Sequence, residues 1–244
     1  MVDVGGNICR LCLKEAELRN SHILPEFLYG NLYDEKHRTL LISRGDEKVI
    51  QKGLREKLLC QSCETKLSKY EQYAKEIIDE IPNFAKDDNL GLIYSDGVDY
   101  VKLKLFQLSI LWRASISSHV AFSQVNLGSH ENIIRTMLDT GNPGNVIDYG
   151  CLMILTLETE LLHAIIQSPT RFTKKLEGHT AYKFPTGNLE WIFLVTRYRI
   201  SHHLQQLFLQ ENGFLRIVLS RYDERSQLMK IAQTLRKFDG KPYS

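Results

Sequence analysis

The spacing of apolar residues predicts three helices in the first 140 residues of the chain. One of them ends at Pro82, which cannot continue a helix, and its apolar residues recur every three or four positions. They are Leu67, Tyr70, Ala74, Ile77, Ile78 and Ile81. A second helix, apolar over a wide arc, is expected at 98–117. A third is expected at 129–139, with Ser129 as its cap and Gly141 after its last turn.

Shorter runs rich in β-branched and aromatic residues predict strands. Residues 38–43 and 47–51 flank a glycine-containing turn and are expected to form a β-hairpin. Such runs dominate the second half of the chain, and a turn at 185–188 favours an antiparallel meander. The runs are 152–156, 164–166, 180–184, 191–195 and 214–219. One more helix is expected at 226–238, where the apolar spacing becomes helical again.

Four of the five cysteines occur in two CxxC pairs, and they carry the clearest chemical signal. Cys9 and Cys12 form the first pair, and Cys60 and Cys63 form the second. This spacing lets the two thiolates of a pair bind the same Zn²⁺ ion. Four thiolates complete a tetrahedral shell and leave no position for water or substrate, so the predicted zinc ion is structural. The fifth cysteine, Cys151, is expected to be a buried small apolar residue.

The order of these features predicts the domain organisation. A knuckle, a hairpin and a second knuckle that opens into a helix are the order of a treble-clef zinc fold. The sequence therefore predicts an α+β protein with a small treble-clef zinc domain at 1–81. A linker is expected at 82–96, because this stretch begins with proline and is charged and polar. A larger domain of helices and an antiparallel sheet is expected at 97–244.

Composition narrows the function classes only slightly. With 43% hydrophobic and 25% charged residues and a net charge of +2, the 244-residue chain has the composition of a soluble globular protein. The charge is uneven, because residues 160–244 carry 13 lysines and arginines against 7 acidic residues. We expect a cytoplasmic protein without a membrane partner, since neither a signal peptide nor a membrane-length apolar run is found.

A short string between the two cysteine pairs, Ser21-His22-Ile23-Leu24-Pro25, suggests a catalytic function. With the flanking knuckles it makes residues 7–72 resemble the HNH, or His-Me finger, endonucleases. The chain is also similar to uncharacterised bacterial proteins with SHIxP and CxxCE strings. The HNH resemblance implies that His22 is the general base that activates water for attack on a phosphodiester. It also implies Mg²⁺ or Mn²⁺ at the scissile phosphate, and a context in phage defence or mobile elements.

The sequence departs from the HNH pattern at the second metal-binding position. Glu64 follows Cys63 where the family usually has His or Asn, and Ser21 stands where an acidic residue or a second histidine is usual. In place of the usual His or Asn, the catalytic metal could be bound by Glu64, or by His37 if folding brings it near. His22 also has a structural interpretation, as a capping or core histidine beside the zinc ion.

Two groups of cations are candidate contacts to a phosphate backbone. They are Arg55, Lys57, Lys66 and Lys69 around the second knuckle, and Arg197 and Arg199 further along the chain. A solvated charged surface is the alternative for both groups. Two functions therefore remain open. One is a DNA- or RNA-binding protein, with metal-dependent endonuclease activity as the finer hypothesis; the other is a non-enzymatic, zinc-braced module that binds a protein or a ligand. Composition and motifs do not indicate the oligomeric state.

Overall fold

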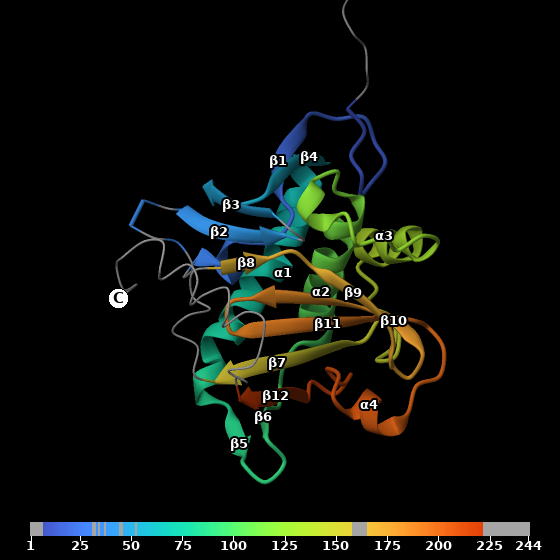
Figure 1. Ribbon diagram of the computed structural model, residues 1–244. Helices are drawn as coiled ribbons and strands as arrows, with labels where there is room; N and C mark the ends of the chain where they lie inside the picture. Colours follow the sequence, from blue (N-terminus) through green and yellow to red (C-terminus); the bar gives the residue numbers. More distant parts are fainter. Residues whose placement is uncertain are drawn as a thin grey trace, which may run out of the picture.

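The computed structural model describes residues 7–221 apart from 31–32, 34, 37, 44–45, 52 and 158–164. Within these residues, a ten-stranded sheet, a separate two-stranded ribbon and four α-helices form an α+β fold (Figure 1). The helices are α1 (Gln61–Glu80), α2 (Tyr100–Ile116), α3 (His130–Thr140) and α4 (His202–Gln206), with 3-10 turns η1 (Glu26–Leu28), η3 (Ile81–Asn83) and η4 (Val120–Phe122). The helix predicted at 226–238 lies outside the described residues.

The main sheet is mixed rather than antiparallel as predicted. Its strands run in the order β3-β2-β8-β10-β11-β7-β12-β6-β5, and β9 also pairs with β10. Their bounds are β2 (Arg38–Ser43), β3 (Asp46–Gln51), β5 (Ala85–Asp87), β6 (Leu92–Ser95), β7 (Cys151–Leu157), β8 (Ile165–Gln167), β9 (Thr170–Leu176), β10 (His179–Thr186), β11 (Leu189–Val195) and β12 (Leu215–Arg221). The pairs β7–β12 and β2–β8 are parallel, and each joins strands that are far apart in the sequence.

Both sides of the predicted linker contribute to this one sheet. The hairpin β2–β3, expected within the zinc domain, pairs with β8 instead. Strands β5 and β6 lie within the stretch expected to be a linker, and β6 pairs with β12. The division into domains at residue 82 stays a prediction, but the sheet joins segments from both sides of it.

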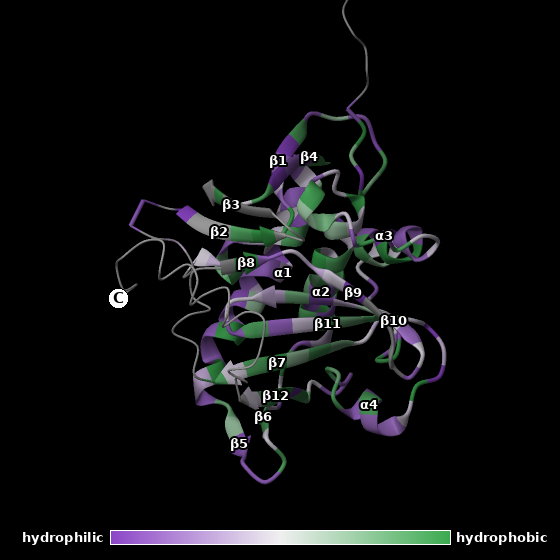
Figure 2. Ribbon diagram, in the orientation of Figure 1, coloured by the Kyte–Doolittle hydropathy of each residue, from purple (hydrophilic) through white to green (hydrophobic). Residues whose placement is uncertain are grey.

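Helix α2 forms the centre of the core and packs on one face of the sheet. The Phe106 ring lies 5.8 Å from the Trp191 ring of β11, and 5.7 Å from the Phe27 ring of η1 on the other side. Both α1 and α3 pack against α2, which explains why its apolar residues surround it almost completely. Figure 2 shows the central strands as largely apolar, and Trp112 and Trp191 are both buried in this core.

The remaining two strands form a ribbon that connects the cysteine pairs. Strand β1 (Leu18–His22) pairs antiparallel with β4 (Arg55–Cys60), with His22 opposite Arg55. Helix α1 begins directly after β4 and ends before Pro82, as the apolar spacing predicts. The order is therefore a knuckle, a ribbon and a helix, and the hairpin β2–β3 belongs to an insert between the two ribbon strands. Neither ribbon strand was predicted from the sequence, and β5, β6, β9 and α4 were missed too.

One capping prediction needs correction. Ser129 occupies the N-cap position of α3, but its side chain makes no capping hydrogen bond. The other end follows the prediction, because Gly141 adopts a left-handed conformation with φ of 75° and closes the helix.

Candidate metal centre and the site around His22

The four paired cysteines meet at one point, as the sequence predicts. The sulfur atoms of Cys9, Cys12, Cys60 and Cys63 all lie within 4.8 Å of one another, and none forms a disulfide. The Cys12 and Cys60 sulfurs are 3.9 Å apart. Zn–S bonds of about 2.3 Å in a tetrahedron place sulfurs about 3.8 Å apart. The spacing and the all-thiolate donor set therefore fit a structural Zn²⁺ site.

Local backbone geometry positions the sulfurs. The first knuckle turns tightly, with the Leu13 amide donating to the Cys9 carbonyl and Leu13 itself at a positive φ of 60°. The second pair straddles the junction of strand and helix, since Cys60 ends β4 and Cys63 lies in the first turn of α1. The Cys60 amide donates to the Cys9 sulfur at 3.3 Å, so the second knuckle stabilises a thiolate of the first.

The thiols differ in how readily they ionise before metal binds. Burial opposes ionisation of Cys60, but hydrogen bonds from the Ser62 hydroxyl and the Cys63 backbone amide lower the pKa of Cys60 to about 6. Burial and the neighbouring sulfurs raise the pKa of Cys63. Burial likewise raises the pKa of Cys12. Cys60 therefore supplies the first thiolate at neutral pH.

The first cysteine knuckle is also bound to α3 by a hydrogen bond. The Arg135 guanidinium of α3 donates to the carbonyl of the fully buried Leu11 at 2.8 Å. Lys66 of α1 donates to the Asp139 carbonyl in the last turn of α3 at 2.5 Å. The cysteine cluster is therefore held against α1 and α3. It also adjoins the ribbon, because Cys60 is the last residue of β4.

His22 ends the ribbon strand β1 and is partly buried, with 24% of its side chain exposed. Its Nε2 atom lies 3.5 Å from a carboxylate oxygen of Glu26 in η1. Nε2 is shielded from solvent and has no hydrogen-bond partner in the described part of the chain. Burial, followed by the positive charge of Arg55, lowers the pKa of His22, whereas Glu26 opposes this. The imidazole is therefore neutral at physiological pH.

A buried arginine fixes the backbone beneath this histidine. Arg113 of α2 is only 1% exposed and donates to the His22 carbonyl at 2.9 Å. Its second terminal nitrogen lies 2.7 Å from a carboxylate oxygen of Glu71 on α1. A buried charge with this pairing holds α1, α2 and the end of β1 in one arrangement.

The positions that depart from the HNH pattern contact each other. Ser21, which is 1% exposed, donates a hydrogen bond to the Glu64 carboxylate on α1. Within the described ranges, the four cysteines are the one group of three or more His, Cys, Asp or Glu side chains close enough to share a metal ion. Glu64 therefore offers a single carboxylate for a second metal, and His37 lies outside the described residues.

The predicted cations do not form one surface. Arg55 pairs with Glu26 at 3.5 Å, and Lys66 is engaged with α3, whereas Lys57 and Lys69 are exposed. The second group lies on a different part of the molecule, after β11. There, Arg197 pairs with Asp148 at 3.1 Å and Arg199 lines a pocket.

Three residues of the His22 site were missed by the sequence reading: Glu26, Glu71 and Arg113. Glu26 lies four residues after His22, a spacing that can bring two side chains together across a helical turn, and this signal was available. Arg113 gave none, because it lies 91 residues from His22 in an apolar helix. His202 and His203 are exposed neighbours on α4 and belong to no metal cluster of the described residues.

Comparison with known proteins identifies no relative for this arrangement. No protein-family model matches the chain, and neither a curated protein nor a solved structure matches it. Within the described residues, no helix is long and apolar enough to cross a membrane.

Proposed function

We propose that this protein binds nucleic acid through a treble-clef zinc segment and that His22 acts as a general base in metal-assisted phosphodiester hydrolysis. The observation that carries the proposal is the state of His22. It is a neutral, partly exposed imidazole at the end of a strand tied to the four-cysteine cluster, with a carboxylate beside Nε2. A neutral imidazole in a fixed orientation is the form that can accept a proton from water.

The residues divide the reaction as follows. The Glu26 carboxylate, 3.5 Å from Nε2, favours the Nε2–H tautomer of His22, which leaves Nδ1 to take a proton from water. The resulting hydroxide attacks phosphorus, the bond to the leaving oxygen breaks, and that oxygen takes up a proton from solvent, to which the His22 imidazolium later returns its own. Arg113 is a positioning residue, because it holds the His22 backbone rather than the substrate. Glu64 is the candidate ligand for Mg²⁺ or Mn²⁺, which would neutralise charge on the phosphate.

The ribbon supplies cations near the histidine. Pairing places Arg55 opposite His22 and Lys57 opposite Asn20, and positions two apart lie on the same face of a strand. Lys57 therefore extends the His22 face with an exposed charge, suited to a neighbouring phosphate. Nucleic-acid affinity should accordingly fall as salt concentration rises, since binding releases counterions.

The second candidate is a non-enzymatic module that binds a protein or ligand. The hydrogen bond between Ser21 and Glu64 favours it, because it satisfies the two side chains that would otherwise face a catalytic metal. On this alternative, the zinc ion braces the fold, and His22 with Glu26 and Arg55 forms a structural polar cluster.

A cleavage assay separates the two candidates. The zinc-loaded full chain is incubated with supercoiled DNA and with single-stranded RNA, with Mg²⁺ or Mn²⁺. We expect nicking or cleavage that His22→Ala lowers by roughly 100-fold or more, in the range of general-base catalysis. His203→Ala is the matched control, because it removes an exposed histidine on α4. Cleavage that survives His22→Ala would refute the proposed base, and salt-insensitive or absent binding would favour the interaction module.

A further inference from the structure

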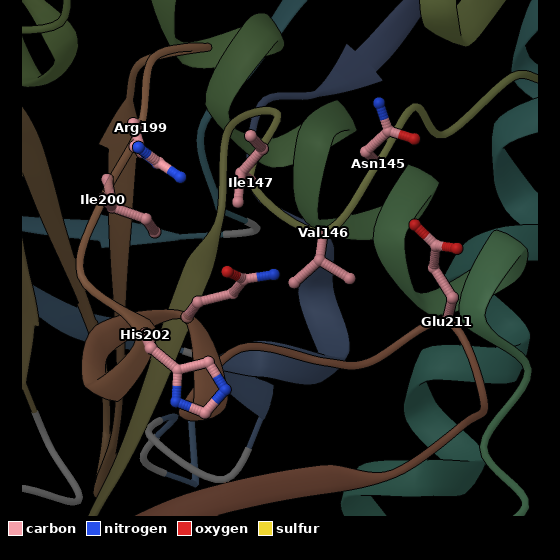
Figure 3. A pocket seen from close by; sticks show the side chains of 8 residues that line it. Asn145, Val146, Ile147, Arg199, Ile200, His202 and Glu211 are labelled. Carbon is pink, nitrogen blue, oxygen red and sulfur yellow. The ribbon is translucent and has the colours of Figure 1, made fainter.

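A pocket of about 480 Å³ lies away from the zinc segment, beside α4. Three segments line it: the loop after α3, the loop before α4 with α4 itself, and the turn after α4 (Figure 3). The lining residues are Asn145, Val146, Ile147, Arg199, Ile200, His202, Gln205 and Glu211. Figure 1 places α4 at the opposite end of the molecule from the β1–β4 ribbon. The volume falls within the range of small-molecule sites.

The positive and the negative side chains of the pocket lie on opposite sides of it. Figure 3 shows Arg199 and Glu211 on opposite sides, with Val146 and Ile147 between them. Arg197, two residues before Arg199, is neutralised by Asp148, whereas Arg199 has no hydrogen-bond or ion-pair partner among the described residues. Glu211 likewise has none within those ranges. A free guanidinium and a free carboxylate across an apolar floor suit an elongated ligand with unlike ends.

A histidine reinforces the cationic side. The Nε2 atom of His202 lies 3.1 Å from the side-chain amide nitrogen of Gln206. An amide nitrogen can only donate, so Nε2 accepts and the ring proton resides on Nδ1. His202 therefore retains a donor for an anion. Arg199 and His202 together favour a phosphate over a single carboxylate charge.

The walls are held in place without a ligand. Asp148 accepts from the Asn145 backbone amide at 2.9 Å and also pairs with Arg197, which fixes the loop after α3. Glu177 accepts from the Ser201 amide at 2.7 Å, and the Ser201 hydroxyl caps α4. Ligand binding therefore requires little ordering of the backbone.

We propose that this pocket binds a nucleoside monophosphate whose base carries an exocyclic amine. Arg199 and His202 contact the phosphate, Val146 and Ile200 contact the apolar faces of the ligand, and Glu211 accepts hydrogen bonds from the amine. An α-amino acid fits less well, because its ammonium and carboxylate groups are attached to the same carbon and cannot reach opposite walls. The proposal is independent of the proposed nuclease function.

Titration calorimetry of the zinc-loaded full chain with CMP, UMP, AMP and GMP tests this site. CMP and UMP form the sharpest pair, because UMP has an oxygen in place of the amine of CMP. We expect CMP to bind about tenfold or more tightly than UMP, the scale of one base-edge hydrogen-bond pair. A basic dipeptide is tested as the competing ligand, because it also carries unlike charges that could reach Arg199 and Glu211.

Two variants assign the ends of the ligand. Arg199→Ala should weaken all four nucleotides by about tenfold or more, the scale of a charge-assisted contact. Glu211→Gln should reduce the preference for CMP over UMP, because an amide also offers a donor. Arg171→Ala, which removes an exposed arginine on β9, is the matched control. The proposal is overturned by equal binding of CMP and UMP, by unchanged binding in Arg199→Ala, or by binding of the dipeptide alone.

Discussion

The four-cysteine cluster and the His22 site adjoin each other but are built on opposite principles. The cluster collects four like donors within 4.8 Å, so a single ion satisfies all of them. The His22 site combines one histidine, two carboxylates and two guanidiniums from the ribbon, η1, α1 and α2. It leaves Nε2 without a hydrogen bond. The first region therefore suits a structural ion, and the second is the region to which our proposal assigns the chemistry.

Removal of one cysteine should give the largest effect. Cys60→Ser is expected to abolish zinc binding and unfold the N-terminal segment, since the binding free energy of structural zinc, about 10 kcal/mol or more, is also folding free energy. Zinc content and thermal melting measure this. Cys151→Ser changes the buried cysteine outside the cluster and should keep its zinc. Equal zinc content in Cys60→Ser and the wild type would contradict the four-thiolate site.

Replacement of the buried arginine should be the next largest effect. Arg113→Met leaves the His22 carbonyl and Glu71 without their partner, so we expect a loss of about 3 kcal/mol of unfolding free energy. Denaturant unfolding measures the loss. Glu71→Gln keeps a hydrogen-bond acceptor for Arg113 and should cost less. Zinc content should stay the same in Arg113→Met. A fall in zinc content would show that the cysteine cluster depends on the His22 site for its structure.

The stability of the protein should fall in mild acid because of His22. The pKa of His22 is lowered in the folded state, so the unfolded chain binds a proton first as the pH falls below 6.5. The contribution of His22 to stability is therefore complete above pH 6.5 and is lost as the pH falls through the folded-state pKa. His22→Gln should flatten this part of the curve of stability against pH. His203→Gln, which replaces an exposed histidine on α4, is the control variant.

The smallest effect is expected at Glu26. Its charge raises the pKa of His22 against burial and Arg55, so Glu26→Gln should lower that pKa further. Stability should change by less than about 1 kcal/mol, because both partners are partly exposed. NMR titration of the imidazole measures the shift. An upward shift would mean that Glu26 does not act on His22 as the geometry indicates.

Local patterns predicted the parts of this molecule that depend on neighbouring residues. The helices α1, α2 and α3, the hairpin β2–β3 and the cysteine spacing all follow from short-range periodicity or motifs. The parallel pairs β7–β12 and β2–β8 did not, because pairing between distant strands leaves no local signal. The same limit hid Arg113, whose apolar neighbours indicate only that α2 is buried.

The state of the His22 ring tests the central claim most directly. The zinc-loaded full chain, with its histidines labelled with ¹⁵N, is titrated by NMR, and the His22 signals are assigned by comparison with His22→Gln. We expect a pKa below 6.5 and the Nε2–H tautomer, with the proton toward Glu26 and Nδ1 available as the base. A pKa at or above 6.5, or the proton on Nδ1, would contradict the account of His22 as a neutral, oriented general base.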